Sequence, residues 1–392
     1  MRRLGRASLA GLAALVGLAA LVLPSVGPAA GDQVAGPARN FAGSVQLDYL
    51  AVTHRQTVHD RSFDGPTLEL SLKLSADLTD NLTANVKVCF ACHGFEVGMA
   101  YVDFRRSDAL NLRAGRFTPA FGSFPLRHDP ANHRTGDKPL PYDMGRMVRF
   151  RDWNEGILPA PWVDNGIEVN GTLSAGKQIQ LDYAVYAIAG PKGTADGFDF
   201  DYTLSRSPER YYVDNNSEPS FGARLSATLI QGDTSLALGG SAMAGHYDPQ
   251  AKLRFWIGGA DATLQMPWLV LRAEYLVRHT QVAIGSTPEL RFKYSAGANG
   301  RFADDVIRDG FYAEAEVPLG RVDLVARWDG LRQFGNVAAA SPLRSTSIVL
   351  RYTGALAIRL AGALRLKASV EKYDFSDFTD EIAVHLGLTT VF

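Results

Sequence analysis

The sequence has little cysteine, no long apolar run beyond its first 30 residues, and no excess of either charge. Two cysteines in 392 residues are too few for a metal site of four thiols. No later run of apolar residues reaches the roughly 20 that a membrane-spanning helix needs. The 40 basic and 41 acidic residues nearly cancel, which argues against nucleic acid as a partner.

The first 30 residues have the pattern of a secretory signal peptide. Three arginines precede an apolar run at about residues 9–23, and small residues follow. That run is too short to anchor the chain as a spanning helix. We therefore expect residues 1–30 to be removed on export and residues 31–42 to form a short periplasmic segment. Removal leaves 37 basic against 41 acidic residues.

Glycine, aromatic residues and alternation are what the chain contains instead. It has 38 glycines, 20 phenylalanines and 14 tyrosines, which for an exported protein suggests many short strands joined by turns. In EIAVHLGLTTVF, residues 381–392, apolar side chains occupy every second position from Ile382 to Leu388. TLELSLKLSADL, residues 67–78, and FGARLSATL, residues 221–229, alternate in the same way. Such alternation suits strands with lipid on one side and an aqueous lumen on the other.

Counting these segments predicts about 16 strands, an even number typical of bacterial barrels. They are expected near residues 43–54, 67–78, 82–90, 95–105, 110–117, 165–174, 178–189, 220–230, 234–246, 252–265, 268–280, 310–317, 321–332, 345–353, 356–374 and 379–392.

The connections between these strands support the barrel. Every second connection is a short link, the last of them TGA at residues 353–355. The connections between them include nearly all the long links. Short periplasmic turns that alternate with longer outer loops are typical of outer-membrane barrels, whereas a propeller or a sandwich has no reason to keep this parity. The sequence therefore predicts an all-β fold, a transmembrane antiparallel β-barrel over residues 43–392 in the bacterial outer membrane.

One stretch carries a family resemblance. AYVDFRRSDALNLRAGRFTPAFGSF, residues 100–124, resembles the strand–turn–strand of phosphate-selective-porin-like outer-membrane proteins. The resemblance implies a porin-like barrel, a homotrimer, and a third outer loop, residues 118–164, that folds into the lumen. That loop region carries six basic and six acidic residues, so phosphate selectivity is not expected to carry over. Its candidate pore-lining residues are Arg146, Arg149 and Arg151.

Both cysteines fall in one motif, CFACH, at Cys89, Cys92 and His93. It matches the signature of covalent c-type haem attachment. Each thiol adds to one vinyl group of the porphyrin, and the adjacent histidine binds the iron on its proximal side. His128 or Met144 in the long loop is the candidate distal ligand. A Cys89–Cys92 disulfide, or a Cys/Cys/His metal site, is the alternative.

Two functions follow from these features. The leading hypothesis is a porin-like barrel in outer-membrane lipid that carries one covalent haem c and transfers electrons. One haem cannot connect both faces of an apolar band about 25 Å tall, so a periplasmic or multihaem cytochrome, or haems of neighbouring subunits, must act as partner. The alternative is a passive diffusion porin with a Cys89–Cys92 disulfide and no haem. No nucleophile–base–acid pattern stands out, so enzyme activity is not predicted.

Overall fold

The computed structural model describes residues 39–52, 65–91, 94–143, 156–195, 197–200, 202, 213–294 and 302–392. The predicted signal peptide lies outside these residues, and so does most of the predicted periplasmic segment. The first strand begins at Arg39, four residues before the predicted start. The barrel belongs to one compact unit, Ala38–Phe392.

Sixteen antiparallel strands form a closed barrel in the described part of the chain, which confirms the predicted fold class. They are β1 (Arg39–Val52), β2 (Gly65–Thr79), β3 (Leu82–Ala91), β4 (Gly94–Ser107), β5 (Leu110–Phe117), β6 (Asp164–Ala175), β7 (Ile179–Ile188), β8 (Ser220–Gln231), β9 (Thr234–His246), β10 (Arg254–Met266), β11 (Leu269–Gln281), β12 (Asp305–Leu319), β13 (Val322–Gly335), β14 (Thr346–Ala361), β15 (Leu364–Phe375) and β16 (Glu381–Val391).

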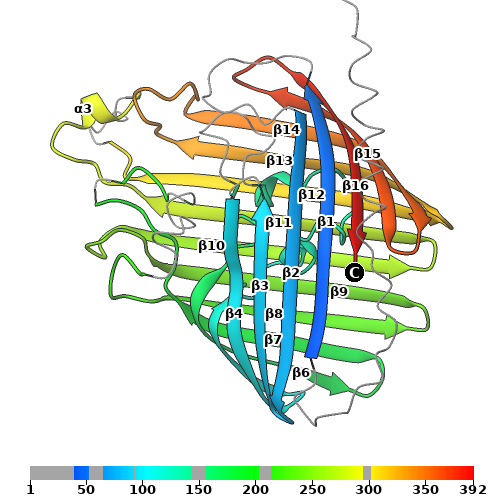
Figure 1. Cartoon of the computed structure of the whole chain (residues 1–392). Helices are drawn as coiled ribbons and strands as arrows, with labels where there is room; N and C mark the ends of the chain where they lie inside the picture. Colours follow the sequence, from blue (N-terminus) through cyan, green and yellow to red (C-terminus); the bar gives the residue numbers. More distant parts are fainter. Residues whose placement is uncertain are drawn as a thin grey trace, which may run out of the picture. The chain divides into compact units, whose positions relative to one another are not determined.

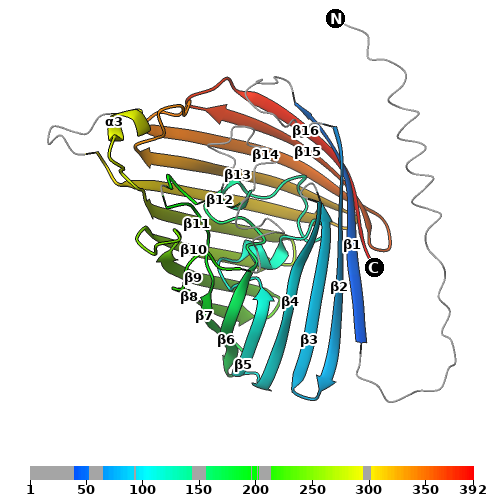
Figure 2. The same ribbon diagram turned by 60° about the vertical axis from the view of Figure 1, so that its left-hand side comes forward.

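Each strand pairs with its neighbours along the chain, and β1 pairs with β16 to close the ring (Figures 1 and 2). The closing register sets Ser44 opposite Val391 and Val52 opposite Ala383. Closure leaves no unpaired edge, and a bilayer tolerates none. None of the helices within the described ranges is long and apolar enough to cross a membrane.

The alternation seen in the sequence sorts side chains to the two faces of the wall. On β16, Ile382, Val384 and Leu386 are exposed on the outer face, whereas His385 and Thr389 are buried on the inner face. Exposed aromatic side chains lie near both ends of the strands, as in the interfacial girdles of membrane barrels. They include Phe90, Phe221 and Trp256 toward the long-loop end and Phe104, Trp268 and Phe392 toward the short-turn end.

The predicted turn at residues 353–355 is wrong. β14 continues through this stretch to Ala361, and β15 begins at Leu364. Gly362 has a φ of +51°, a left-handed conformation that glycine adopts without strain and that the tight turn requires. Period-two alternation continues through Gly354, so the pattern alone could not separate a turn from a strand there. The predicted strand at 356–374 is therefore the end of β14 joined to most of β15.

An apolar cluster fills part of the barrel interior toward the long-loop end. The Phe200 ring lies 5.6 Å from Tyr202, 5.1 Å from Tyr247 and 4.9 Å from Phe255, centroid to centroid. Trp162 adds a T-shaped contact with Tyr202 at 5.2 Å. Segments that follow β5, β7 and β9 therefore meet inside the ring of strands.

Candidate functional site

The connection from β5 to β6, residues 118–163, is called the inward loop here because its described residues contact inward-facing side chains. Glu274 on β11 holds its first part. The carboxylate accepts hydrogen bonds from Ser123 N (3.1 Å), Ser123 Oγ (2.7 Å), Phe124 N (2.7 Å), Tyr142 OH (2.5 Å) and Tyr312 OH (2.5 Å). Glu274 is only 3% exposed, so these five donors replace its hydration.

Two arginines on nearby strands of the wall, Arg327 on β13 and Arg351 on β14, hold the next segment of the inward loop by its backbone. Arg327 Nη1 donates to Thr135 Oγ1 at 2.9 Å and to the Asp137 carbonyl at 3.1 Å. Arg351 Nη2 donates to the Lys138 carbonyl at 2.5 Å. These contacts fix residues 135–138 against β13 and β14, because both guanidiniums are fully buried.

Ion pairs with the wall neutralise charged side chains of the inward loop. Arg127 lies 3.3 Å from Glu314, and Arg134 lies 2.8 Å from Asp323 and 3.2 Å from Glu316. The six basic and six acidic residues of the loop region therefore do not simply neutralise one another. Carboxylates of the barrel wall pair with the loop arginines Arg127 and Arg134.

A cavity of about 1050 Å³ lies beside the inward loop. Its walls are inward-facing residues of β1–β8 and the loop residues 118–132, and it reaches the short-turn end at Asp108 and Phe392. Among the described residues, five basic and five acidic side chains line it: Lys73, Lys87, Arg105, Arg113 and Arg224, with Asp103, Asp108, Asp129, Glu168 and Asp182.

Most of these charges are paired. Arg113 Nε lies 2.8 Å from Asp103, and its Nη1 lies 3.5 Å from Glu168. The guanidinium of Arg113 also stacks over the Tyr101 ring at 4.6 Å. The charged side chains of the described lining have no excess of one sign, and rings of one sign are the usual device for ion selectivity.

Cys89 and His128 are the predicted haem residues that the structure describes. Cys89 lies on β3 and, by the alternation of the strand, on the same inward face as the buried Asn85 and Lys87. Lys87 Nζ lies 3.2 Å from His128 Nε2, and His128 Nδ1 lies 2.5 Å from the Pro125 carbonyl. Both ring nitrogens of His128 are thus engaged, so iron ligation requires the contact with Lys87 to break. Burial lowers the pKa of His128 to about 4, and the Lys87 ammonium acts in the same direction.

The other predicted site residues lie outside the described residues, and their roles stay predictions. They are Cys92, His93, Met144, Arg146, Arg149 and Arg151.

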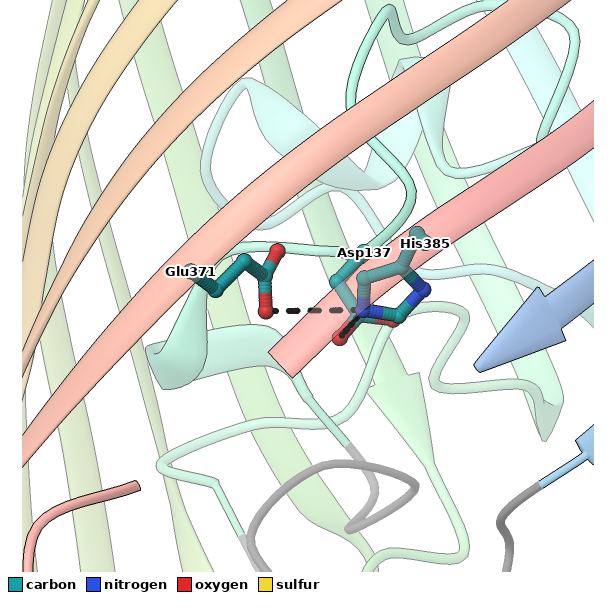
Figure 3. Close-up of side chains that lie close together, drawn as sticks. All are labelled: Asp137, Glu371 and His385. Carbon is teal, nitrogen blue, oxygen red and sulfur yellow. Dashed lines mark ion pairs between the residues drawn. The ribbon is translucent and has the colours of Figure 1, made fainter. Parts of the chain in front are cut away.

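The structure also brings together three residues that the sequence analysis did not single out (Figure 3). His385 Nε2 lies 3.5 Å from Asp137 Oδ2 and 3.6 Å from Glu371 Oε2, and all three residues are buried. The alternation of apolar and polar residues in the sequence would have placed His385 of β16 and Glu371 of β15 on the inner face of the barrel. Nothing in the sequence places Asp137 of the inward loop beside them.

Solved structures of several bacterial outer-membrane proteins share this fold. The outer membrane channel DcaP of Acinetobacter baumannii is 14% identical with a TM-score of 0.57, covering 93% of this chain and 100% of that chain. An anion-selective porin from Comamonas acidovorans is 12% identical with a TM-score of 0.53, covering 91% and 100%. A trimer form of OmpT of Vibrio cholerae is 11% identical with a TM-score of 0.50, covering 91% and 100%.

At these identities the likeness shows a porin-like barrel fold and no more. No protein-family model matches the sequence, and no curated protein matches it either.

Proposed function

We propose that the protein is a porin-like channel of the bacterial outer membrane that admits small solutes by size, with little preference for charge. The observation that carries this proposal is the inward loop, which is fixed inside a closed barrel beside a cavity whose described basic and acidic side chains balance. The apolar outer face and the two aromatic girdles support placement in a bilayer. The long loops then face outward and the short turns face the periplasm.

Assembly and chemistry follow the same proposal. A homotrimer is supported by the trimer form of OmpT among the structures of this fold. Passage by diffusion needs no catalytic group, and we propose no enzyme activity.

Planar-bilayer recording tests the channel. Wild-type protein should give discrete conductance steps. Glu274→Ala should give larger and noisier steps, because the loop loses the acceptor for its hydrogen bonds from Ser123, Phe124 and Tyr142. Glu69→Ala is the matched control. Glu69 also lies on the inner face of the barrel, on β2, but its carboxylate makes none of the hydrogen bonds described above with the inward loop. Absence of conductance in correctly folded wild type would remove the proposal.

We further propose that this barrel carries one covalent haem c at Cys89, Cys92 and His93 and acts in electron transfer. The CFACH motif carries this second proposal, and the inward parity of Cys89 near the long-loop end of β3 supports it.

A reduced-minus-oxidised visible spectrum of detergent-purified protein tests the haem. The host must co-express haem-attachment machinery, and a Cys89→Ala, Cys92→Ala variant serves as the control. The sharp band of a reduced c-type haem should appear in wild type, survive denaturation because thioethers are covalent, and vanish in the variant. A colourless wild type whose thiols react only after reduction would instead establish the disulfide and end the electron-transfer proposal.

A further inference from the structure

Three side chains from distant parts of the chain lie close together on the inner side of the barrel wall (Figure 3). Asp137 comes from the inward loop, Glu371 from β15 and His385 from β16. One potential ligand atom from each lies within 4.8 Å of the others. Asp137 is 5% exposed, His385 1% and Glu371 0%. One imidazole nitrogen and two carboxylates are donors that transition metals accept in proteins.

Polar atoms of this cluster lack hydrogen-bond partners although they are buried. They are His385 Nε2, Asp137 Oδ2 and Glu371 Oε1. Buried polar atoms in folded proteins normally make a hydrogen bond, and atoms that make none call for an explanation such as a bound ion. Asp137 Oδ2 and Glu371 Oε1 have only longer ion pairs, to Arg351 at 3.6 Å and to Arg327 at 3.9 Å. Two of these atoms, His385 Nε2 and Asp137 Oδ2, face each other across 3.5 Å, which is too long for a good hydrogen bond.

The other nitrogen of His385 has a partner that suits metal binding. His385 Nδ1 lies 3.3 Å from Asp48 Oδ2 on β1. A proton on Nδ1, donated to this carboxylate, leaves the lone pair of Nε2 directed at Asp137 and Glu371. Histidine ligands of metals commonly donate their second ring N–H to a carboxylate in this way, which fixes the tautomer and the ring orientation.

The backbone of the loop is already positioned for this arrangement. Gly136 N donates to Ser369 Oγ at 2.8 Å. A Cβ added at Gly136 would lie 2.6 Å from His385 Cβ and Cγ, so the loop rests directly on the histidine. Asp137 is therefore held at His385 by its neighbours and needs no large movement to act as a ligand.

The charge of the surrounding ion pairs matches a divalent cation. With neutral His385, the ion pairs around it join four carboxylates to two guanidiniums, an excess of two negative charges within this set. These groups are Asp48, Asp137, Asp329 and Glu371, with Arg327 and Arg351. The nearby Asp143 and Lys367 add one charge of each sign. Arg327 also lies 3.5 Å from Glu314, but that carboxylate belongs to an adjacent group that is balanced three against three. The adjacent group consists of Arg127, Arg134 and Arg272 with Glu314, Glu316 and Asp323.

We propose that Asp137, Glu371 and His385 bind a divalent transition-metal ion such as Zn²⁺, which accepts both imidazole and carboxylate ligands. The ion ties the inward loop to β15 and β16, beside the seam where β16 meets β1. Arg351, at 3.4 Å from Glu371 and 3.6 Å from Asp137, then orients the ligating carboxylates from outside the metal. The competing occupant is a proton on His385, which would make the same contacts as ion pairs.

Metal titration of the folded full-length barrel in detergent tests this site without reference to channel activity. Metal-free wild type should take up one Zn²⁺ per chain, and Co²⁺ in its place should give visible d–d absorption. His385→Gln and Asp137→Asn should each abolish the Co²⁺ bands. Asp48→Asn, which removes only the partner of Nδ1, should weaken Zn²⁺ binding by about 10–100-fold.

His133→Gln is the matched control. His133 is a buried histidine of the same loop, and its Nδ1 contacts the Thr135 carbonyl at 3.1 Å, outside the cluster. This variant should keep full Zn²⁺ binding. If wild type binds no more metal than His385→Gln, protonated His385 occupies the space and the metal proposal is overturned. Should His385→Gln fail to fold, Zn²⁺ uptake and the Co²⁺ spectrum of wild type decide the question, and absence of both overturns it equally.

Discussion

At the scale of the residue, Lys87, His128 and Asp129 join the inward loop to β3. Lys87 Nζ lies 2.5 Å from Asp129 and 3.2 Å from His128 Nε2. Burial away from water keeps this imidazole neutral and the Lys87 ammonium adds to that effect, whereas the Asp129 carboxylate opposes it. The contact therefore depends on a histidine that stays unprotonated in the folded chain.

This contact predicts a pH dependence of stability. The pKa of His128 is lowered by burial from 6.5 to about 4. Neutral His128 therefore contributes fully to the free energy of unfolding above pH 6.5. This contribution is lost as the pH falls toward 4, because His128 binds a proton in the unfolded chain at a higher pH than in the folded chain. The full linkage amounts to about 3 kcal/mol. Urea unfolding in lipid vesicles between pH 4 and 7 measures it. His128→Gln should lose this part of the pH dependence, and an identical profile for both proteins would contradict the assignment.

At the scale of the element, the strands could be predicted from the sequence because a two-sided wall imposes alternation on every strand. The error at residues 353–355 shows the limit of that signal, since alternation does not distinguish a turn from a continuing strand. The site was less predictable. The inward parity of Glu371 and His385 could be derived, but the place of Asp137 depends on how a long loop packs, and loops carry no period.

The two glycines of this region provide a matched comparison. Gly362→Ala should destabilise the barrel by about 1 kcal/mol, because an L-residue at a φ of +51° is strained. Gly354→Ala should be neutral or slightly stabilising, since no atom lies within 4 Å of its added Cβ and its φ is not left-handed. Urea midpoints of the two variants in lipid vesicles measure the difference. Equal loss in both would argue for a turn at 353–355.

At the scale of the whole molecule, the balance of charge in the cavity determines what the channel discriminates. Within the part of the chain that the structure describes, five basic and five acidic side chains face the same space, so wild type should show a zero-current potential near zero in a potassium chloride gradient. Asp182→Asn removes one negative charge and should shift that potential toward anion preference. Asp309→Asn is the control, since Asp309 pairs with the exposed Arg332 away from the cavity. A shift in the control alone would contradict this account.

The distance along the chain between the inward loop and its contacts determines the order in which the molecule can assemble. Ser123 lies 151 residues before its acceptor Glu274, and Gly136 lies 233 residues before its acceptor Ser369. Contacts of such high sequence separation form late and slow folding. The loop can therefore contact β11–β14 first, but it lacks its last contacts until β15 and β16 are in place. Closure of the ring and the last contacts of the loop, those with β15 and β16, thus form together at the end.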